Sequence, residues 1–367
     1  MPRRLRLLAM TIAKYGERLE NKKAMLTENK EKNKSLKNSI SILLLCIVIS
    51  VAILYLFNIY QWSFAPFYGF GWRTFSGWAV VGRVYEDGYK AGFRVGDRII
   101  EINGEPVKSL ASLRNMVNKE IGALNRFIIL RDEKKHTVDY HTSRFGLARV
   151  AMVFGIPWLI GILIICIGAF IFYTTPIENR KWSFFLFCLC AGLLLIFFNQ
   201  RTLRPPWVQI FGLIGFCFLP ATILHMAFIS PFYEEFNRRH SIYTFFSYII
   251  SFFLFIVINA FSAFFSESPK YLRSSILIYC FLSILVFIIM LFYEYKKFSN
   301  RLAKLKIRVV LFGFYIGVLL PLAEPLLNSI FGIFILPNIE MATLPFITVF
   351  PLSIAYAIVK HDLFEID

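Results

Sequence analysis

Residues 91–104, with the sequence AGFRVGDRIIEING, combine two tight-turn signals with a strand between them. Gly96-Asp97 and Asn103-Gly104 supply residues that accept the positive φ angles of tight turns. The residues between these turns are rich in isoleucine and partly alternate between apolar and polar, which is the pattern of a half-buried strand. The stretch therefore predicts a small domain with β structure at its centre.

The segments on both sides extend this pattern into an α+β domain. An apolar strand over 78–84 and a polar turn at 85–88 come before it. A predicted helix follows, in which Ser109 is the N-cap, Gly122 ends the helix, and one face carries Leu110, Leu113, Met116 and Val117. Two further strands, 127–130 and 136–140, close the domain as a hairpin across 132–134.

Residues 91–104 resemble the signature of bacterial PDZ domains, and the order of elements over 75–142 is similar to that family. The resemblance implies that an extended peptide or a C-terminus is captured by β-augmentation, with its carboxylate held by backbone amides. The implied groove has on its strand side Gly77, Trp78, Ala79 and Val80, and on its helix side Leu113, Met116 and Val117. Residues 76–79 match the family's carboxylate loop of the Gly-Leu-Gly-Phe type only loosely. Core packing also produces apolar helical stripes, so the helix residues have that second interpretation.

The rest of the chain has the composition of a membrane protein. Of its 367 residues, 57% are hydrophobic and only 17% are charged. A spanning helix needs about 20 apolar residues, and eight segments qualify: 39–59, 150–173, 182–199, 207–230, 241–264, 274–294, 308–331 and 342–359. We therefore expect a polytopic α-helical membrane protein with about eight transmembrane helices and a small α+β PDZ domain inserted between the first two.

These boundaries divide the chain into five regions. Residues 1–38 form a basic N-terminal segment and 39–59 the first transmembrane helix. Residues 60–149 contain the PDZ domain with its flanks, and the core of that domain is 75–142. Residues 150–359 are expected to form a seven-helix transmembrane bundle, and 360–367 a cytoplasmic tail or linker.

The charge distribution predicts the orientation of the chain in the cell membrane. The net charge is +17, and most basic residues lie beside apolar runs, so a nucleic-acid partner is not needed to explain them. The two tails and the loops after the second, fourth and sixth spans hold 22 Lys and Arg residues, whereas the opposite short loops hold four: Arg201, Arg204, Lys270 and Arg273. The positive-inside rule then places both termini in the cytoplasm and the PDZ domain outside it.

Catalytic and metal-binding motifs are missing from the sequence. The His-Glu-x-x-His pattern of an intramembrane metalloprotease does not occur, and neither do nucleotide-binding glycine loops. The six cysteines all lie in apolar runs without the spacing of metal ligands. We therefore expect no cofactor, no metal and no enzymatic activity in this chain.

Polar positions within the predicted spans are candidates for function because ionisable groups are costly in a bilayer. Glu324 lies between Pro321 and Pro325 in the seventh span, where prolines free backbone carbonyls and kink the helix. We expect these three residues to form a hinge; a hydrogen-bonded packing role, or a position nearer the interface, also fits Glu324. His225 in the fourth span is expected to join a polar cluster or to form an ordinary hydrogen bond between helices.

The layout of the whole chain resembles the input regions of bacterial multi-span sensors of the ComP-type histidine kinase family. The resemblance rests on residues 224–231, LHMAFISP, and on residues 351–367, PLSIAYAIVKHDLFEID. It implies a signal-sensing module that binds a peptide or protein ligand and acts on a cytoplasmic output domain or partner, with an oligomer possible. In that family the output domain is a kinase, phosphatase or cyclase, so residues 1–367 are expected to be an excised input module or a receptor with a separate partner.

Two other functions stay open. A PDZ-bearing membrane adaptor or chaperone-like protein would recruit extracytoplasmic polypeptides, and it predicts broad peptide binding. A transporter with a regulatory PDZ domain is disfavoured because no inverted repeat or pair of broken helices is evident.

Overall fold

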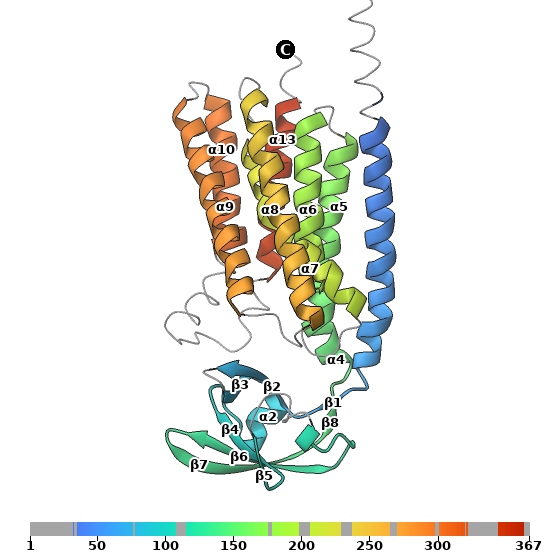
Figure 1. Ribbon diagram of the computed structural model, residues 1–367, viewed down its shortest axis with the longest axis vertical. Helices are drawn as coiled ribbons and strands as arrows, with labels where there is room; N and C mark the ends of the chain where they lie inside the picture. The colour runs from blue at the N-terminus through green and yellow to red at the C-terminus, as the bar shows by residue number, and fades with distance from the viewer. Residues whose placement is uncertain are drawn as a thin grey trace, which may run out of the picture. The chain divides into compact units, whose positions relative to one another are not determined.

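The computed structural model describes residues 32, 35–75, 78–107, 115–174, 178–197, 206–228, 237–264, 270–297, 301–319, 321 and 344–362. These residues are mostly helical, with one β-rich region in the N-terminal half of the chain (Figure 1). The chain divides into two compact units, 1–55 and 56–367.

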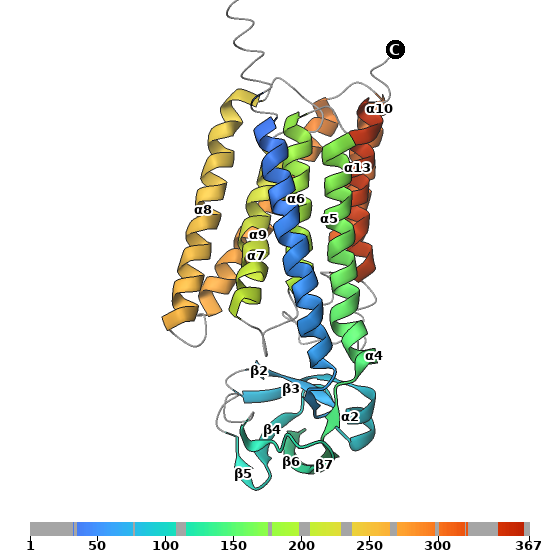
Figure 2. The ribbon, with the colours of Figure 1, turned by 90° about the vertical axis from the view of Figure 1, so that its right-hand side faces the viewer.

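Long apolar helices make up most of the chain. The first is Ser35–Trp62, and those that follow the β-rich region are α5 (Ile156–Thr174), α6 (Glu178–Phe197), α7 (Pro206–Phe228), α8 (Asn237–Phe264), α9 (Lys270–Lys297), α10 (Arg301–Phe314) and α13 (Val349–Asp362). Packing contacts join α5 to α6, α6 to α7, and α13 to both α5 and α10 (Figure 2). Buried side chains of α5, α6 and α13, among them Ile164, Phe184 and Phe350, belong to one apolar core.

Five helical segments are long and apolar enough to cross a bilayer: Ser35–Trp62, Leu147–Thr174, Val208–Phe228, Ile242–Phe261 and Ser274–Lys297. They coincide with five of the eight predicted spans. The predicted spans 182–199 and 342–359 correspond to shorter apolar helices, Lys181–Phe197 and Leu344–Val359. The predicted span 308–331 is described only as far as 319 and at 321. The number of eight spans therefore stays a prediction.

Glycines allow several helices to approach one another closely. A Cβ atom on Gly161 of α5 would lie 2.6 Å from the Ile196 side chain and 2.8 Å from the Gly192 carbonyl oxygen of α6. Gly313 and Gly317, four residues apart, pack in the same way against α13. Small residues at helix crossings are characteristic of membrane proteins, because they bring the two backbones into contact.

The β-rich region, which we call the β domain, covers residues 66–144. Its strands are β1 (Pro66–Phe67), β2 (Phe70–Phe75), β3 (Trp78–Val84), β4 (Arg98–Ile102), β5 (Glu105–Pro106), β6 (Leu124–Arg131), β7 (Lys134–His141) and β8 (Ser143–Arg144). The main sheet has the order β2-β3-β4-β6-β7 with every neighbouring pair antiparallel, β5 pairs with β4, and β1 pairs separately with β8. β2 and β7 are therefore the edges of the main sheet. The sheet begins earlier than the predicted core of 75–142.

The tight turns of the β domain lie where the sequence predicts them. Gly96, Asn103 and Gly104 have φ angles of 97°, 52° and 87°, and the β6–β7 hairpin turns at Asp132 and Glu133 with φ angles of 47° and 60°. The predicted strand after Gly96-Asp97 and the predicted hairpin are both confirmed.

A compact apolar core holds the sheet together. Six apolar side chains of this core have no solvent exposure: Val81, Phe93, Ile99, Ile102, Phe127 and Ile129. Burial of one such side chain contributes about 1.5–3 kcal/mol relative to an exposed position. This cluster is separate from the apolar core of the helices.

The predicted polar turn at 85–88 is wrong, because a short helix, α2 (Glu86–Ala91), begins there. Glu86 and Asp87 occupy its first turn, where the helix dipole favours acidic residues, and Gly92 ends it with a φ angle of 109°. Gly88 serves close packing in place of a turn, since a Cβ atom there would overlap the Gly69 carbonyl group.

The predicted helix 109–122 is described only from residue 115, and it ends earlier than predicted. Residues 115 and 116 are helical, and a bend follows at 117. The side chain of Asn125 binds both the N–H and the carbonyl of Asn118, which gives these backbone groups partners outside the helix. The helix therefore stops well before Gly122.

Candidate functional site

The strand of the predicted groove is an interior strand of the sheet. Residues 78–80 belong to β3, which lies between β2 and β4. On one side β3 pairs with β2, and on the other Val80 pairs with Arg98 while the Val81 N–H donates to the Asp97 carbonyl at 2.8 Å. Addition of a peptide strand needs a row of unpaired backbone groups. The docking strand is therefore expected elsewhere than at 78–80.

The side chains of these three residues have different environments. Ala79 and Val80 are buried, and Ala79 belongs to the core of the β domain. Trp78 is 44% exposed, and the Arg98 guanidinium stacks on its ring. Trp78 is thus the only one of the three with a surface that a partner could contact directly.

The open edge on this side of the sheet belongs to β2. One edge of β2 pairs with β3 from Phe70–Val84 to Phe75–Trp78, and within the described residues no strand pairs with the other edge. Trp72 of β2 is half-buried and stacks on Tyr68 with ring centroids 5.7 Å apart. β2 therefore offers an open backbone edge beside aromatic side chains.

A turn formed by Phe67-Tyr68-Gly69-Phe70 leads directly into β2. Gly69 has a φ angle of 81°, and its carbonyl accepts a hydrogen bond from the Tyr85 N–H at 3.0 Å. A Cβ atom on Gly69 would lie 2.7 Å from the Gly88 Cα, so only glycine fits at this position. The turn ends in Gly-Phe, as the Gly-Leu-Gly-Phe type of carboxylate loop does, and it precedes the open edge. Residues 67–70 are therefore a second candidate for the carboxylate loop beside the predicted 76–79, and the Gly-Phe pair is the sequence signal for it.

The residues predicted to line the helix side of the groove meet the core of the β domain. Val117 is 5% exposed and belongs to that core, in agreement with the second interpretation of the helical stripe. Met116 is half-buried and packs against the core from its surface. Met116 is thus the one of these two residues that keeps exposed surface.

A buried asparagine fixes this segment to the sheet. Asn125 has no solvent exposure; its Oδ1 accepts hydrogen bonds from the Asn118 N–H at 2.7 Å and from Asn103 Nδ2 at 2.9 Å. Asn125 Nδ2 donates to the Asn118 carbonyl and to the Thr142 hydroxyl. Asn103 also donates to the Met116 carbonyl at 3.0 Å. The predicted Asn-Gly turn therefore positions the helix end as well as connecting strands.

The opposite edge of the sheet is protected against pairing. β7 begins with the exposed side chains of Lys134 and Lys135, and lysines on an edge strand discourage the addition of another strand. Farther along β7, Asp139 pairs with Arg126 of β6 at 2.9 Å, and this hydrogen bond lowers the pKa of Asp139. The two edges are thus chemically different.

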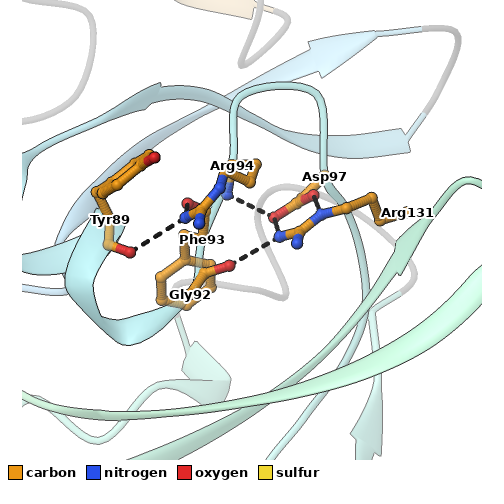
Figure 3. A network of polar contacts seen from close by, with 6 residues as sticks. All are labelled: Tyr89, Gly92, Phe93, Arg94, Asp97 and Arg131. Carbon is orange, nitrogen blue, oxygen red and sulfur yellow. Dashed lines mark hydrogen bonds and ion pairs between the residues drawn. The ribbon is translucent and has the colours of Figure 1, made fainter.

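An ion-pair network fixes the turn between α2 and β4 (Figure 3). The Asp97 side chain is 1% exposed and accepts hydrogen bonds from Arg131 Nε and the Arg94 N–H, both at 2.7 Å. Arg131 also donates to the Gly92 carbonyl at 2.7 Å. The hydrogen bond from Arg131 to Asp97 raises the pKa of the guanidinium, which therefore stays charged. The network joins the end of α2 to the end of β6.

Part of the predicted site lies outside the described residues: Gly77, Leu113, Glu324 and Pro325. His225 of α7 is described, and its Nδ1 lies 2.9 Å from the Tyr248 hydroxyl of α8. Pro321 is helical and half-buried. The hinge at Pro321, Glu324 and Pro325 therefore stays a prediction.

No metal site is formed by the described side chains. Among them, no group of three or more His, Cys, Asp or Glu residues is placed to hold an ion. Cys188, Cys190 and Cys217 are buried within the helices as free thiols. Among the described residues, the open edge of β2 is the candidate site with the clearest geometry.

Comparison with known proteins identifies the β domain. A family model described as PDZ domain matches residues 80–131. None of the curated proteins matches the sequence. The solved structure of a variant of the HtrA-type protease AlgW with a decapeptide is similar, with 18% sequence identity and a TM-score of 0.20 over 22% of this chain and 29% of that chain. The similarity thus spans less than a third of either protein. This chain contains a PDZ domain at residues 80–131.

Proposed function

We propose that this chain is a membrane-embedded signal-sensing module whose PDZ domain binds an extracytoplasmic peptide or protein segment. The bound segment adds as a strand to the open edge of β2, with its C-terminal carboxylate at the turn 67–70. Binding shifts the packing of the membrane helices, and a cytoplasmic output domain or partner responds to that shift.

The open edge of β2 is the observation that supports this proposal most directly. Main-chain hydrogen bonds along an edge strand supply affinity, and neighbouring side chains supply preference. Trp72 on β2 supplies one such side chain, and Met116 from the predicted helix side is likewise half-buried against the domain core. A ligand with an apolar side chain near its C-terminus fits such a surface.

The membrane location is supported by the five helices of spanning length and by the unequal distribution of basic residues. On this topology the PDZ domain lies outside the cytoplasm and both termini lie inside. A ligand released outside the cell would reach the site without crossing the membrane.

Peptide selection on the full chain in lipid nanodiscs tests the proposal. A library of random peptides with free C-termini is panned against the protein, and the affinity of the best binder is measured by calorimetry. We expect amidation of its C-terminus to weaken binding roughly tenfold, because a charge-assisted carboxylate contact is lost. N-methylation of alternate backbone nitrogens should abolish binding, whereas N-methylation of the intervening nitrogens should have little effect, because a strand pairs through every second residue.

Matched variants of the chain locate the binding edge. Trp72→Ala should weaken binding of the selected peptide, because Trp72 lies on β2. Leu124→Ala is the control, since Leu124 is 48% exposed on β6, which β3 and β4 separate from β2. A peptide insensitive to amidation and N-methylation would contradict the proposal. Equal binding of many unrelated extended chains would favour an adaptor over a sensor.

A further inference from the structure

A short folded segment, which we call the neck, links the PDZ domain to the helices before and after it in sequence. The neck consists of residues 62–67 and 143–146. In it, β1 pairs with β8 through Pro66–Arg144 and Phe67–Ser143. The ladder continues toward the helices, since the Phe145 N–H donates to the Ala65 carbonyl at 2.9 Å and the Gly146 N–H to the Ser63 carbonyl at 3.0 Å. The entering and leaving strands are therefore bonded over the whole neck.

One buried ring joins the parts that meet at the neck. Phe145 is 7% exposed. Its ring centroid lies 6.0 Å from that of Trp62 at the end of the first helix, 6.3 Å from that of Tyr85 beside α2, and 6.1 Å from that of Phe154 in the following helix. Aromatic pairs in this distance range stabilise each other by about 0.5–1.5 kcal/mol beyond their burial.

A charged clamp attaches the next helix, α4 (Leu147–Val150), to the PDZ domain. Arg149 of α4 forms an ion pair with Asp87 in the first turn of α2. It also donates to the Phe145 carbonyl at 3.1 Å, and its guanidinium stacks on the Phe67 ring at 4.6 Å. Since Phe67 begins the turn 67–70, the clamp directly contacts the proposed carboxylate site.

The hydrogen bonds of the helix change from four-residue to five-residue spacing immediately beyond this clamp, as between the Ile156 N–H and the Ala151 carbonyl. A π-helical turn, Ala151–Gly155, separates α4 from α5, and Pro157 lies in the first turn of α5. Proline has no N–H to donate to the carbonyl four residues earlier, and π-helical turns mark irregular positions that often have a function. The first helix is helical at every residue from 35 to 62 and has no comparable break.

We infer that residues 151–157 form a joint, about which the PDZ domain, the neck and α4 turn as one body relative to α5. The neck is stiffened by a ladder, an aromatic cluster and an ion pair, whereas the joint is wound as a π-helical turn followed by a proline. A ligand on β2 adjoins the neck through the turn 67–70, so its binding biases the orientation of α4 at the joint. This regulatory role rests on the proposed peptide site; the existence of the joint does not.

Distance measurements on the full chain in nanodiscs test the joint. Spin labels are introduced as unnatural amino acids in two pairs, at Lys135 and Phe170 across the joint, and at Lys135 and Leu147 within the proposed body; all three side chains are exposed. We expect a broad distance distribution for the first pair and a narrow one for the second. Pro157→Ala restores the missing N–H and should narrow the first distribution roughly twofold. Pro220→Ala, in the middle of α7, is the matched control and should leave it unchanged.

A second variant tests the clamp independently. Asp87→Asn should broaden the Lys135–Leu147 distribution roughly twofold, because the charge that holds Arg149 is removed. Glu86→Gln is the matched control, since the neighbouring Glu86 pairs directly with Lys90 at 2.6 Å and attracts Arg149 only as a weaker, unpaired charge. Equal effects of the two variants, or a first distribution that Pro157→Ala leaves broad, would overturn the inference.

Addition of the selected peptide tests the regulatory role of the joint separately from its existence. The inference expects a shift of the Lys135–Phe170 distance on saturation with peptide. A peptide that binds without any shift refutes the regulatory link. A chain that shows the expected distances in all variants but binds no peptide refutes the proposed function alone.

Discussion

Burial decides how much a single charged residue contributes to the PDZ domain. Asp97 and Asp139 each pair with an arginine of β6, but the Asp97 side chain is 1% exposed and the Asp139 side chain 42% exposed. Exposed ion pairs contribute little because water and salt screen them. A buried carboxylate that accepts several hydrogen bonds leaves unpaired groups behind when it is removed.

Asp97→Asn is therefore expected to lower the local free energy of unfolding of the PDZ domain by about 2–4 kcal/mol, because Arg131 loses its charged partner at a buried position. Native-state hydrogen exchange of the β4 and β6 amides in the full chain measures this change. Asp139→Asn on β7 is the control, and we expect a much smaller loss from it because water and salt screen this exposed pair. Similar losses in the two variants would show that burial does not set the contribution.

At the scale of elements, helix contacts depend on the absence of side chains at a few positions. Gly161→Ala places a methyl group 2.6 Å from Ile196 and 2.8 Å from the Gly192 backbone. Overpacking of this kind costs about 1–3 kcal/mol, because α5 and α6 must move apart. We expect a lower midpoint when the full chain is unfolded in a denaturing detergent.

Leu163→Ala provides the comparison within the same helix. Leu163 is 49% exposed. The substitution Leu163→Ala removes more side-chain volume than Gly161→Ala adds. A change at this outward position should alter the free energy of unfolding by less than about 0.5 kcal/mol, with little change in the midpoint. If Leu163→Ala destabilised the chain as strongly as Gly161→Ala, contact between α5 and α6 would not be the cause.

Elements set by local chemistry could be predicted from the sequence, whereas those set by distant partners could not. The turns at Gly96 and Asn103-Gly104 follow from residues that tolerate positive φ angles. The position of β3 inside the sheet depends on β2. In sequence, β2 follows the apolar helix Ser35–Trp62 closely, and its own residues are largely apolar, so the sequence does not mark it as a separate strand. The choice of docking strand therefore required the strand order, and the neck required contacts between residues about 80 apart, such as Phe67 and Ser143.

At the scale of the whole molecule, orientation in the membrane decides what the PDZ domain can bind. The predicted topology rests on 22 basic residues in the tails and loops of one side against four in the short loops of the other. The structure adds lysines that are suited to a direct test. Lys134 and Lys135 are exposed on β7, and Lys296 and Lys297 are exposed at the end of α9.

A membrane-impermeant amine reagent applied to intact cells should therefore modify Lys134 and Lys135 but not Lys296 and Lys297. Permeabilisation of the cells should make the second pair reactive, which confirms that the reagent can reach it once the barrier is removed. Mass spectrometry of the digested protein quantifies both pairs in one sample, so differences in expression cancel. Modification of Lys296 and Lys297 in intact cells, with Lys134 and Lys135 protected, would place the PDZ domain in the cytoplasm. The ligand would then be a cytoplasmic chain, because an extracytoplasmic peptide could not reach β2.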